Sequence, residues 1–399
     1  MKKLINNVDM FIIIMFAAYY CLPIVFVRVP FYVMLLAMIV YIALTAITNF
    51  KVLQEILLSF CSILVINSLL YLVGDVRTIE MFISKTWSLC TCFFPVYLLY
   101  RLKLQPKDNQ KVFLLSCSIM FSITLSLTFV ELLRNPSACR DFFIQTELYQ
   151  RNIGHFDFIY ACVVVVLLCL NIRSIYKERN RAAGVVIVSI WAIFIFVTIL
   201  QSQYTLALLT IIIIWLYSYF LNQQNSKEAF LNRLIGVVLL VVFLPLIFRG
   251  IISIIPSEKV SQRLSEVFAF LFEGDATGSN FSGRIELYIR AIQDFFEGFF
   301  TGNRHAAGGA HSSFLSIASH TGIWGVIVLI FLCYRSKKQV WKLLDNSKRE
   351  ISFFKPAYLA WLITGFTNPV LNSYLLCFVV FCCFPLCIRY FKFDNKTLK

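Results

Sequence analysis

The sequence predicts an all-α polytopic membrane protein: a single integral membrane domain over residues 1–399, with about 12 transmembrane helices and two larger external loops. Apolar residues make up 59% of the chain and charged residues 14%, and the mean hydropathy is +0.79. Soluble domains average about 45–50% apolar and about 25% charged residues. Apolar runs near the length needed to cross a bilayer, about 20 residues, also recur along the whole chain.

Twelve apolar runs account for this helix count, because each is close to the length of one bilayer crossing. They lie at residues 9–27, 30–48, 55–73, 82–100, 112–133, 156–172, 183–200, 204–221, 234–254, 313–334, 356–368 and 370–388. No clear small-residue cleavage site follows the first run, so we expect a retained helix there rather than a signal peptide.

The basic residues predict the orientation of these helices. If the amino terminus is cytoplasmic and each run crosses once, the cytoplasmic segments hold 24 of the 36 Lys and Arg. The formal charge is then +16 on the cytoplasmic side and −1 on the other side. Retention of positive charge in this way is typical of membrane proteins, so we expect both termini to be cytoplasmic. Basic residues scattered over membrane loops also argue against nucleic-acid binding.

Two external loops stand out by length, at about residues 134–155 and 249–312. The second contains a segment, Arg284 to Phe300, in which apolar residues recur at helical spacing. We expect this segment to form a helix along the outer membrane surface, with Arg284 and Arg290 facing polar material. Of the 13 cysteines only Cys139 lies clearly in an external loop, so we expect no disulfide there.

Titratable residues concentrate at the end of the second loop. His305, His311 and His320, three of the four histidines, fall within sixteen residues where the loop meets an apolar run. Their spacings of six and nine residues fit no common metal-ligand pair, and no HExxH motif occurs, so we expect neither a metal nor a cofactor. The apolar runs contain essentially no charged residues, which disfavours a proton-coupled carrier and favours a site at the outer boundary.

The residues around His311 form a motif. The run is His311-Ser312-Ser313-Phe314-Leu315, followed by Gly322-Ile323-Trp324-Gly325 and preceded by Ser282-Gly283-Arg284 and Gly302-Asn303. It resembles the His-[Asn/Ser]-x-x-Leu…Gly-x-x-Gly signature of the O-antigen polymerase and ligase superfamily. The segment from Arg151 to Phe156 is similar to the family's exit from its first large loop. The chain departs from the family at Gln201-Ser202-Gln203-Tyr204, where many members have a Ser-Arg pair.

The resemblance implies glycosyl transfer at the outer face of the bacterial cytoplasmic (inner) membrane. A sugar hydroxyl would attack the anomeric carbon of a glycan linked to undecaprenyl diphosphate, and the lipid diphosphate would leave. Histidine suits the role of base because a neutral fraction exists near pH 7, and arginine suits the leaving group because its planar fork binds phosphate oxygens in pairs. The expected catalytic residues are therefore His311 and Arg284.

Further contacts to the substrate are expected from Arg140, Arg151, Arg304 and Ser312, and each has a simpler explanation. Loop arginines are commonly solvated charges, and Ser312 could simply cap the helix that begins after it. His305 and His320 fall outside the catalytic part of the motif, and hydrogen bonding is the simplest role for His320.

Three functions remain open at this point. The favoured one is a metal-independent polymerase that joins repeat units of an O-antigen or a capsule. The second is a ligase that transfers the glycan to lipid A–core with the same residues. The third is a flippase or other transporter of lipid-linked glycans. The expected partners are the undecaprenyl-diphosphate-linked glycan, membrane lipid and a chain-length regulator, with no nucleic acid among them.

Overall fold

Helices joined by short turns make up the described part of this computed structural model, which contains no strand among those residues. The structure describes residues 2–140, 144–221, 279–306, 312–344 and 348–393, together with residues 245–246, 249–250, 252–253, 261–262, 265 and 268–269. The α-helices of the first half are α1 (Lys2–Cys21), α2 (Pro23–Arg28), α3 (Phe31–Thr48), α4 (Phe50–Val73), α5 (Ile79–Phe93), α6 (Pro95–Leu104), α7 (Lys107–Arg134), α8 (Gln145–Gln150), α9 (Phe156–Glu178), α10 (Ala182–Gln201) and α11 (Thr205–Leu221). Those of the second half are α14 (Ser279–Glu297), α15 (Ser313–Leu343), α16 (Lys348–Thr367), α17 (Tyr374–Phe378) and α18 (Phe384–Phe393), with 3₁₀ turns at Ala138–Arg140 and Val370–Asn372 and a π-helical turn at Val379–Cys383.

Eight helical segments of the described residues are long and apolar enough to cross a membrane. They are Phe31–Thr48, Phe50–Val73, Ile79–Leu104, Lys107–Arg134, Phe156–Glu178, Ala182–Gln201, Ser313–Leu343 and Tyr374–Phe391. Two of them join consecutive helices, α5 with α6 and α17 with α18. The chain is thus an all-helical, multi-pass membrane protein. Of the other four expected runs, 234–254 falls almost wholly outside the described residues. Runs 204–221 and 356–368 correspond to α11 and the second half of α16, which are not among the eight.

The first expected run, 9–27, is interrupted. Its helix α1 ends at Cys21, and a separate helix α2 begins at Pro23. A proline ring fixes its own backbone and disfavours helical geometry in the residue before it, and Leu22 is accordingly extended. The apolar part of α1, Val8–Cys21, is therefore shorter than a full crossing.

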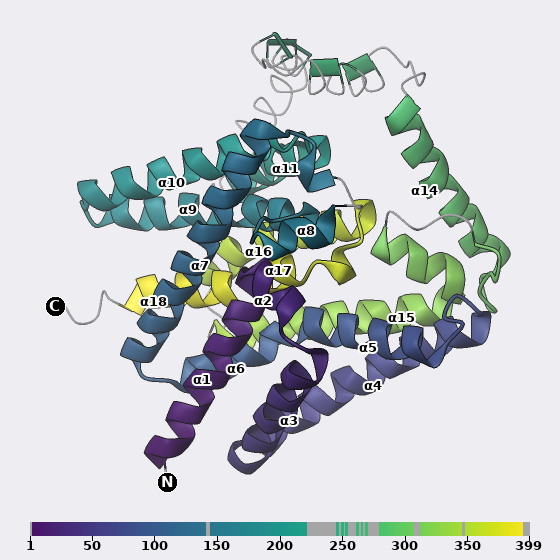
Figure 1. Cartoon of the computed structure of the whole chain (residues 1–399), viewed down its shortest axis with the longest axis horizontal. Coiled ribbons are helices and arrows are strands. Elements are labelled where there is room, and N and C mark those ends of the chain that lie inside the picture. Colours follow the sequence, from purple (N-terminus) through teal and green to yellow (C-terminus); the bar gives the residue numbers. More distant parts are fainter. Residues whose placement is uncertain are drawn as a thin grey trace, which may run out of the picture.

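The connections gather at two opposite ends of the bundle. At one end, which we call the loop end, the Ile24 amide donates to Asn152 Oδ1 at 3.4 Å and the Ser88 hydroxyl donates to the Leu371 carbonyl at 2.9 Å. At the other, the basic end, the guanidinium of Arg179 donates to the carbonyl of Phe391. In Figure 1 the turn between α9 and α10 and the end of α18, which belong to the basic end, lie at the left of the view.

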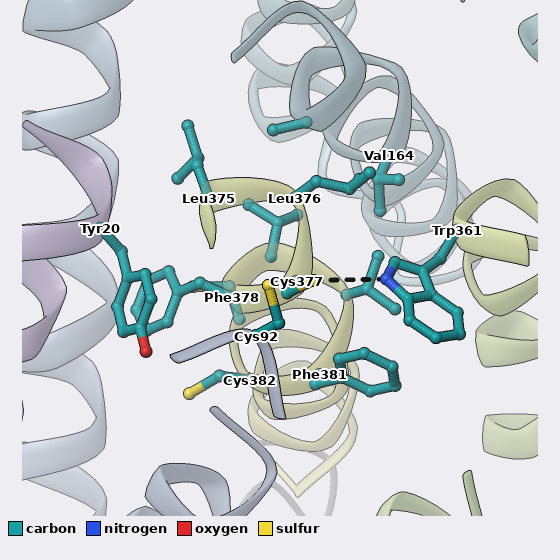
Figure 2. Close-up of a cluster of buried hydrophobic side chains, with 14 of the residues drawn as sticks. Tyr20, Cys92, Val164, Trp361, Leu375, Leu376, Cys377, Phe378, Phe381 and Cys382 are labelled. Atoms are coloured by element: carbon teal, nitrogen blue, oxygen red, sulfur yellow. Dashed lines mark hydrogen bonds between the residues drawn. The ribbon is translucent and has the colours of Figure 1, made fainter. Parts of the chain in front are cut away.

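The core lies where α17 and the π-helical turn pass between the other helices. Figure 2 shows this region: the ring of Tyr20 stacks on Phe378 with centroids 4.7 Å apart, and the Trp361 indole donates to Cys377 Sγ at 3.3 Å. Trp361 and Phe378 are fully buried. Aromatic side chains of this size bury large apolar areas, so this segment joins α1, α5 and α16 into one packed unit.

One ion pair is buried inside the bundle at the basic end. Arg101 of α6 pairs with Asp9 of α1, each 3% exposed, and Arg101 also donates to the hydroxyl of Thr48 at 2.6 Å. The expectation of charge-free helix interiors therefore has an exception here. The two charges neutralise each other and link α1, α3 and α6.

Helix α15 is kinked at Gly322, whose backbone angles are φ 60° and ψ −151°. Only glycine adopts this conformation without strain. The turn that follows α14 packs into the kink. The Asn303 amide donates to the Ser319 carbonyl at 3.2 Å, and the Ile323 amide donates to the Phe299 carbonyl at 2.8 Å. A Cβ at position 322 would lie 2.4 Å from the Phe299 oxygen, so the close approach of α14 also requires glycine.

The kink determines the position of His320, two residues before it. Its Nδ1 lies 2.8 Å from the Ser316 carbonyl oxygen, and its Nε2 lies 3.6 Å from Asp75, which also pairs with Lys85. Asp75 is in the connection between α4 and α5, so His320 lies at the loop end rather than deep within its span. Hydrogen bonding is the role that these contacts support.

Candidate functional site at the loop end

The expected first external loop is folded onto the bundle. Cys139 and His155 are fully buried, and Leu148 and Ile153 are nearly so. The Gly154 amide donates to the hydroxyl of Thr128 at 2.8 Å, which ties the loop to α7. This packing holds Arg140, in the 3₁₀ turn, against the loop end.

Arg140 lies over an aromatic ring. Its guanidinium carbon is 4.9 Å from the centroid of Tyr204, which lies between α10 and α11. The Tyr204 hydroxyl donates to the Cys139 carbonyl at 2.6 Å, so the ring is fixed. Two guanidinium nitrogens of Arg140, Nε and Nη1, are buried and have no hydrogen-bond partner in the part of the chain that the structure describes. Buried charged donors are normally satisfied, so these two nitrogens are a place for an acceptor to bind.

Arg284 reaches the same region from α14. It interacts electrostatically with the phenols of Tyr160, Tyr204 and Tyr288, which we call the phenol cluster. The rings of Tyr160 and Tyr204 are 5.9 Å apart. Among the described residues, no carboxylate lies within ion-pair distance of Arg284. Two arginines from different external segments thus converge on one set of tyrosines.

The phenols of this cluster stay protonated near neutral pH. Burial raises the pKa of Tyr204 well above its ordinary value, and Arg284 offsets only part of that rise. Burial likewise raises the pKa of Tyr288, again against the lowering effect of Arg284. Each neutral phenol has one O–H to donate. The hydroxyls of Tyr204 and Tyr288 donate to backbone carbonyls, whereas the Tyr160 hydroxyl accepts from Asn368. Tyr160 is therefore the phenol of this cluster that can donate to an anionic ligand alongside the guanidinium groups.

The turn that ends α16 joins the phenol cluster to the start of α15. The Tyr288 hydroxyl donates to the Thr367 carbonyl at 2.9 Å, and the Asn368 amide donates to the Tyr160 hydroxyl at 2.8 Å. In the same turn the Asn368 carbonyl accepts from the Ser313 amide at 3.2 Å. The start of α15 therefore lies beside the phenol cluster, which both arginines approach.

Ser312 is fully buried and caps α15. Its Oγ accepts from the Leu315 amide at 3.1 Å and donates to the Gly365 carbonyl at 3.0 Å. These bonds support the capping role, and the substrate contact expected of Ser312 stays a prediction. His311, the expected base, lies outside the described residues, directly before Ser312 in the sequence.

The remaining two expected arginines lie elsewhere. Arg151, at the end of α8, pairs with Glu131 of α7 at 2.7 Å and is half exposed. Arg304 is exposed and follows the far end of α14, and the helix runs about 20 Å from Arg284 to its end at Glu297, at 1.5 Å per residue. The structure thus brings Arg140, Arg284 and Ser312 together, whereas none of the described contacts of Arg151 or Arg304 is with the phenol cluster.

A carboxylate completes the cluster. Asp157, in the first turn of α9, interacts electrostatically with Tyr204 and is hydrogen-bonded to the Tyr149 hydroxyl. The motif around His311 includes neither Asp157 nor Asn368 nor the three tyrosines of the phenol cluster. In the sequence, Tyr160, Tyr204 and Asn368 lie near the ends of apolar runs, where tyrosine is common in any membrane protein, and Tyr288 lies within the amphipathic segment of the second loop. Among the described residues, no group of three or more His, Cys, Asp or Glu could hold a metal ion.

Comparison with known proteins adds no family to this geometry. No family model matches the chain, and no curated protein matches it. The function is therefore argued from the site itself and from the motif around His311.

Proposed function

We propose that this protein is a glycosyltransferase that polymerises undecaprenyl-diphosphate-linked oligosaccharide repeat units at the outer face of the bacterial cytoplasmic membrane. The observation that carries the proposal is the convergence of Arg140 and Arg284 on the phenol cluster, next to the start of α15. The resemblance of the segment around His311 to the O-antigen polymerase and ligase superfamily supplies the reaction class.

The reaction requires positive charge where the leaving group departs. As the bond between the anomeric carbon and the diphosphate oxygen breaks, negative charge grows on the diphosphate. Arg284 and the unsatisfied nitrogens of Arg140 would bind that charge, and the Tyr160 hydroxyl, which accepts from Asn368, would donate one further hydrogen bond. In this proposal His311 takes the proton of the attacking sugar hydroxyl, which forms the new glycosidic bond. No metal or cofactor is needed for these steps.

The proposed orientation places the loop end outside the cytoplasm. Basic residues concentrate at the opposite end, as the positive-inside rule expects of the cytoplasmic face. The expected partners follow: the lipid-linked glycan as donor and acceptor, surrounding membrane lipid, and a chain-length regulator.

Deletion of the gene in its host tests the reaction class. Single repeat units on the lipid A–core, seen on a polysaccharide gel, are the expected result of losing a polymerase. Polymer retained on undecaprenyl diphosphate beside bare core would instead identify a ligase, which would use the same residues. Lipid-linked units that never reach the outer face would contradict enzymatic function and identify a transporter.

Substitutions of the converging arginines test the site. We expect Arg140→Ala and Arg284→Ala each to reduce polymerisation on the order of 10²–10³-fold, as observed when one charge-stabilising donor is removed from an enzyme. Arg290→Ala is the matched control, because Arg290 lies on the same helix as Arg284 but is exposed and pairs with Glu286. Polymerisation is measured on membranes with equal amounts of inserted protein. Wild-type chain lengths from Arg284→Ala would contradict its assignment to the leaving group.

A further inference from the structure

The surface of helix α14 divides into three flanks. The flank that packs on the protein contains Ala291, which is 1% exposed, and the buried Gly298. Arg284 and Tyr288 share this flank by helical spacing, which explains why Arg284 reaches the phenol cluster. The expectation that Arg284 faces polar material at the surface is replaced by this inward position.

The second flank is apolar and exposed. It consists of side chains at helical spacing that are between 46% and 69% exposed: Ile289, Ile292, Phe296 and, just beyond the helix, Phe300. Ile285, which is half-buried, begins the same row. A continuous exposed apolar row of this length on a protein surface marks an interaction site.

The third flank is exposed and polar. Its residues are Glu286, Arg290, Gln293 and Glu297, and within it Arg290 pairs with Glu286. The exposed surface of α14 is therefore itself divided, with apolar side chains along one edge and charged side chains along the other. A helix at a membrane surface has this division, because one edge contacts lipid and the other contacts water.

The apolar flank continues onto a membrane-spanning helix. The indole of Trp324, on α15 just after the kink, donates to the Phe300 carbonyl at 3.1 Å. From Trp324 the exposed apolar row runs on along α15 through Ile327, Ile330 and Tyr334. Figure 1 shows α14, in green, beside the kinked start of α15. The exposed row of α15 belongs to a candidate span and therefore faces lipid. Because the row on α14 is continuous with it, we expect lipid to cover that row as well.

We infer that α14 lies in the plane of the membrane, with its apolar flank in the acyl region of the outer leaflet and its polar flank in water. The occupant of the flank is bilayer lipid. Trp324 then lies at the boundary between headgroups and acyl chains, where its amphipathic ring is most stable.

This placement sets the depth of Arg284. The guanidinium comes from the flank of α14 between lipid and the bundle, so it is held near the level of lipid phosphates. That consequence rests on the proposed function in two respects, namely that the loop end faces outward and that the phosphate bound there belongs to the donor. The lipid contact of α14 itself does not depend on catalysis.

Fluorescence quenching in vesicles tests the inference. Single cysteines are introduced at Ile292 and Phe296 on the apolar flank, and at their neighbours Gln293 and Glu297 on the polar flank. The background is the full chain with Cys61→Ala, because Cys61 is the one exposed native cysteine. Each variant is labelled with nitrobenzoxadiazole and reconstituted into phosphatidylethanolamine–phosphatidylglycerol vesicles, and labelled background protein provides the blank.

We expect the labels at 292 and 296 to emit at shorter wavelength and to be quenched by spin-labelled lipids, while those at 293 and 297 are quenched by aqueous iodide. Equal iodide quenching at all four positions would overturn the inference, because the apolar flank would then face water. Protection of 292 and 296 from both quenchers would also overturn it, since protein rather than lipid would cover the flank. The quenching measurement does not depend on enzymatic turnover. The inferred lipid contact can therefore be disproved while the proposed activity holds, and the proposed activity can be disproved while the lipid contact holds.

Discussion

At the scale of single residues, Arg284 was expected from a motif and Arg140 from its place in a loop, whereas the tyrosines beside them were not expected. Arg284 belongs to a Ser-Gly-Arg pattern, and Arg140 is one of few basic residues in its loop. Tyr160, Tyr204 and Tyr288 lie in segments far apart in the sequence and meet only through tertiary packing. The unsatisfied nitrogens of Arg140 could not be expected either, because partners of a buried donor depend on the fold.

Cys139 illustrates how burial controls reactivity outside the membrane spans. It is fully buried, and burial raises the pKa of its thiol to about 12. At pH 8 only about one part in 10⁴ of such a thiol is the reactive thiolate. We expect Cys139 to remain unmodified by iodoacetamide at pH 8 in the folded, detergent-solubilised protein and to react after unfolding in sodium dodecyl sulfate, as measured by mass spectrometry. Equal modification of Cys139 before and after unfolding would show that the loop is open rather than packed.

The buried pair of Asp9 and Arg101 makes a second residue-scale prediction. Removing one partner leaves an uncompensated buried charge, which costs about 3–5 kcal/mol of stability. We expect Asp9→Ala to lower the thermal unfolding temperature in detergent strongly. The double variant Asp9→Leu/Arg101→Met should recover most of the loss, because it removes both charges together. A double variant as unstable as Asp9→Ala would show that packing, rather than charge, is what matters at this position.

At the scale of elements, apolar length predicted most helices and backbone chemistry corrected the rest. The helix over 284–300 was expected from its periodicity, and α14 covers most of it. The break at Leu22 follows from Pro23, a signal that a count of apolar residues ignores. The kink at Gly322 gave no comparable signal, since glycine is frequent in straight membrane helices.

Gly322 also supports a prediction about how α14 is held. Gly322→Ala would place a methyl group against the Phe299 carbonyl and also force a conformation that costs about 1–3 kcal/mol. Gly74→Ala is the control for a positive φ without a clash: Gly74 has φ 87° and ψ 12°, in the left-handed helical region, and nothing lies within 4 Å of the added Cβ. We expect Gly322→Ala alone to increase protease cleavage at the end of α14. Equal cleavage in both variants would show that the contact with Phe299 contributes nothing.

At the scale of the whole molecule, the membrane class was predicted from composition alone. Eight candidate spans in the described residues confirm a multi-pass helical protein. The full number of crossings was harder to predict, because α11 and α16 are borderline in length or polarity and hydropathy cannot separate a crossing from a buried helix. Which side faces the cytoplasm stays a prediction from charge.

Reporter fusions check that orientation. Both termini belong to helices whose ends lie at the basic end, since Asp9 pairs with Arg101 there and Phe391 accepts from Arg179. We expect green fluorescent protein fused at either terminus to fluoresce, and alkaline phosphatase at either terminus to be inactive. Phosphatase activity at one terminus only would mean an odd number of crossings. Phosphatase activity at both termini would show that the protein has the opposite orientation, with the candidate site on the cytoplasmic side.

The bonds on either side of Gly322 have a consequence for insertions and deletions. The bonds that join Phe299 to Ile323 and Asn303 to Ser319 use backbone atoms, so they depend on the number of residues between positions 299 and 303. One inserted residue would move the Asn303 amide about 3.8 Å along the chain and break its bond. Connections between helices ordinarily vary in length among related chains. In this one, the length should stay constant.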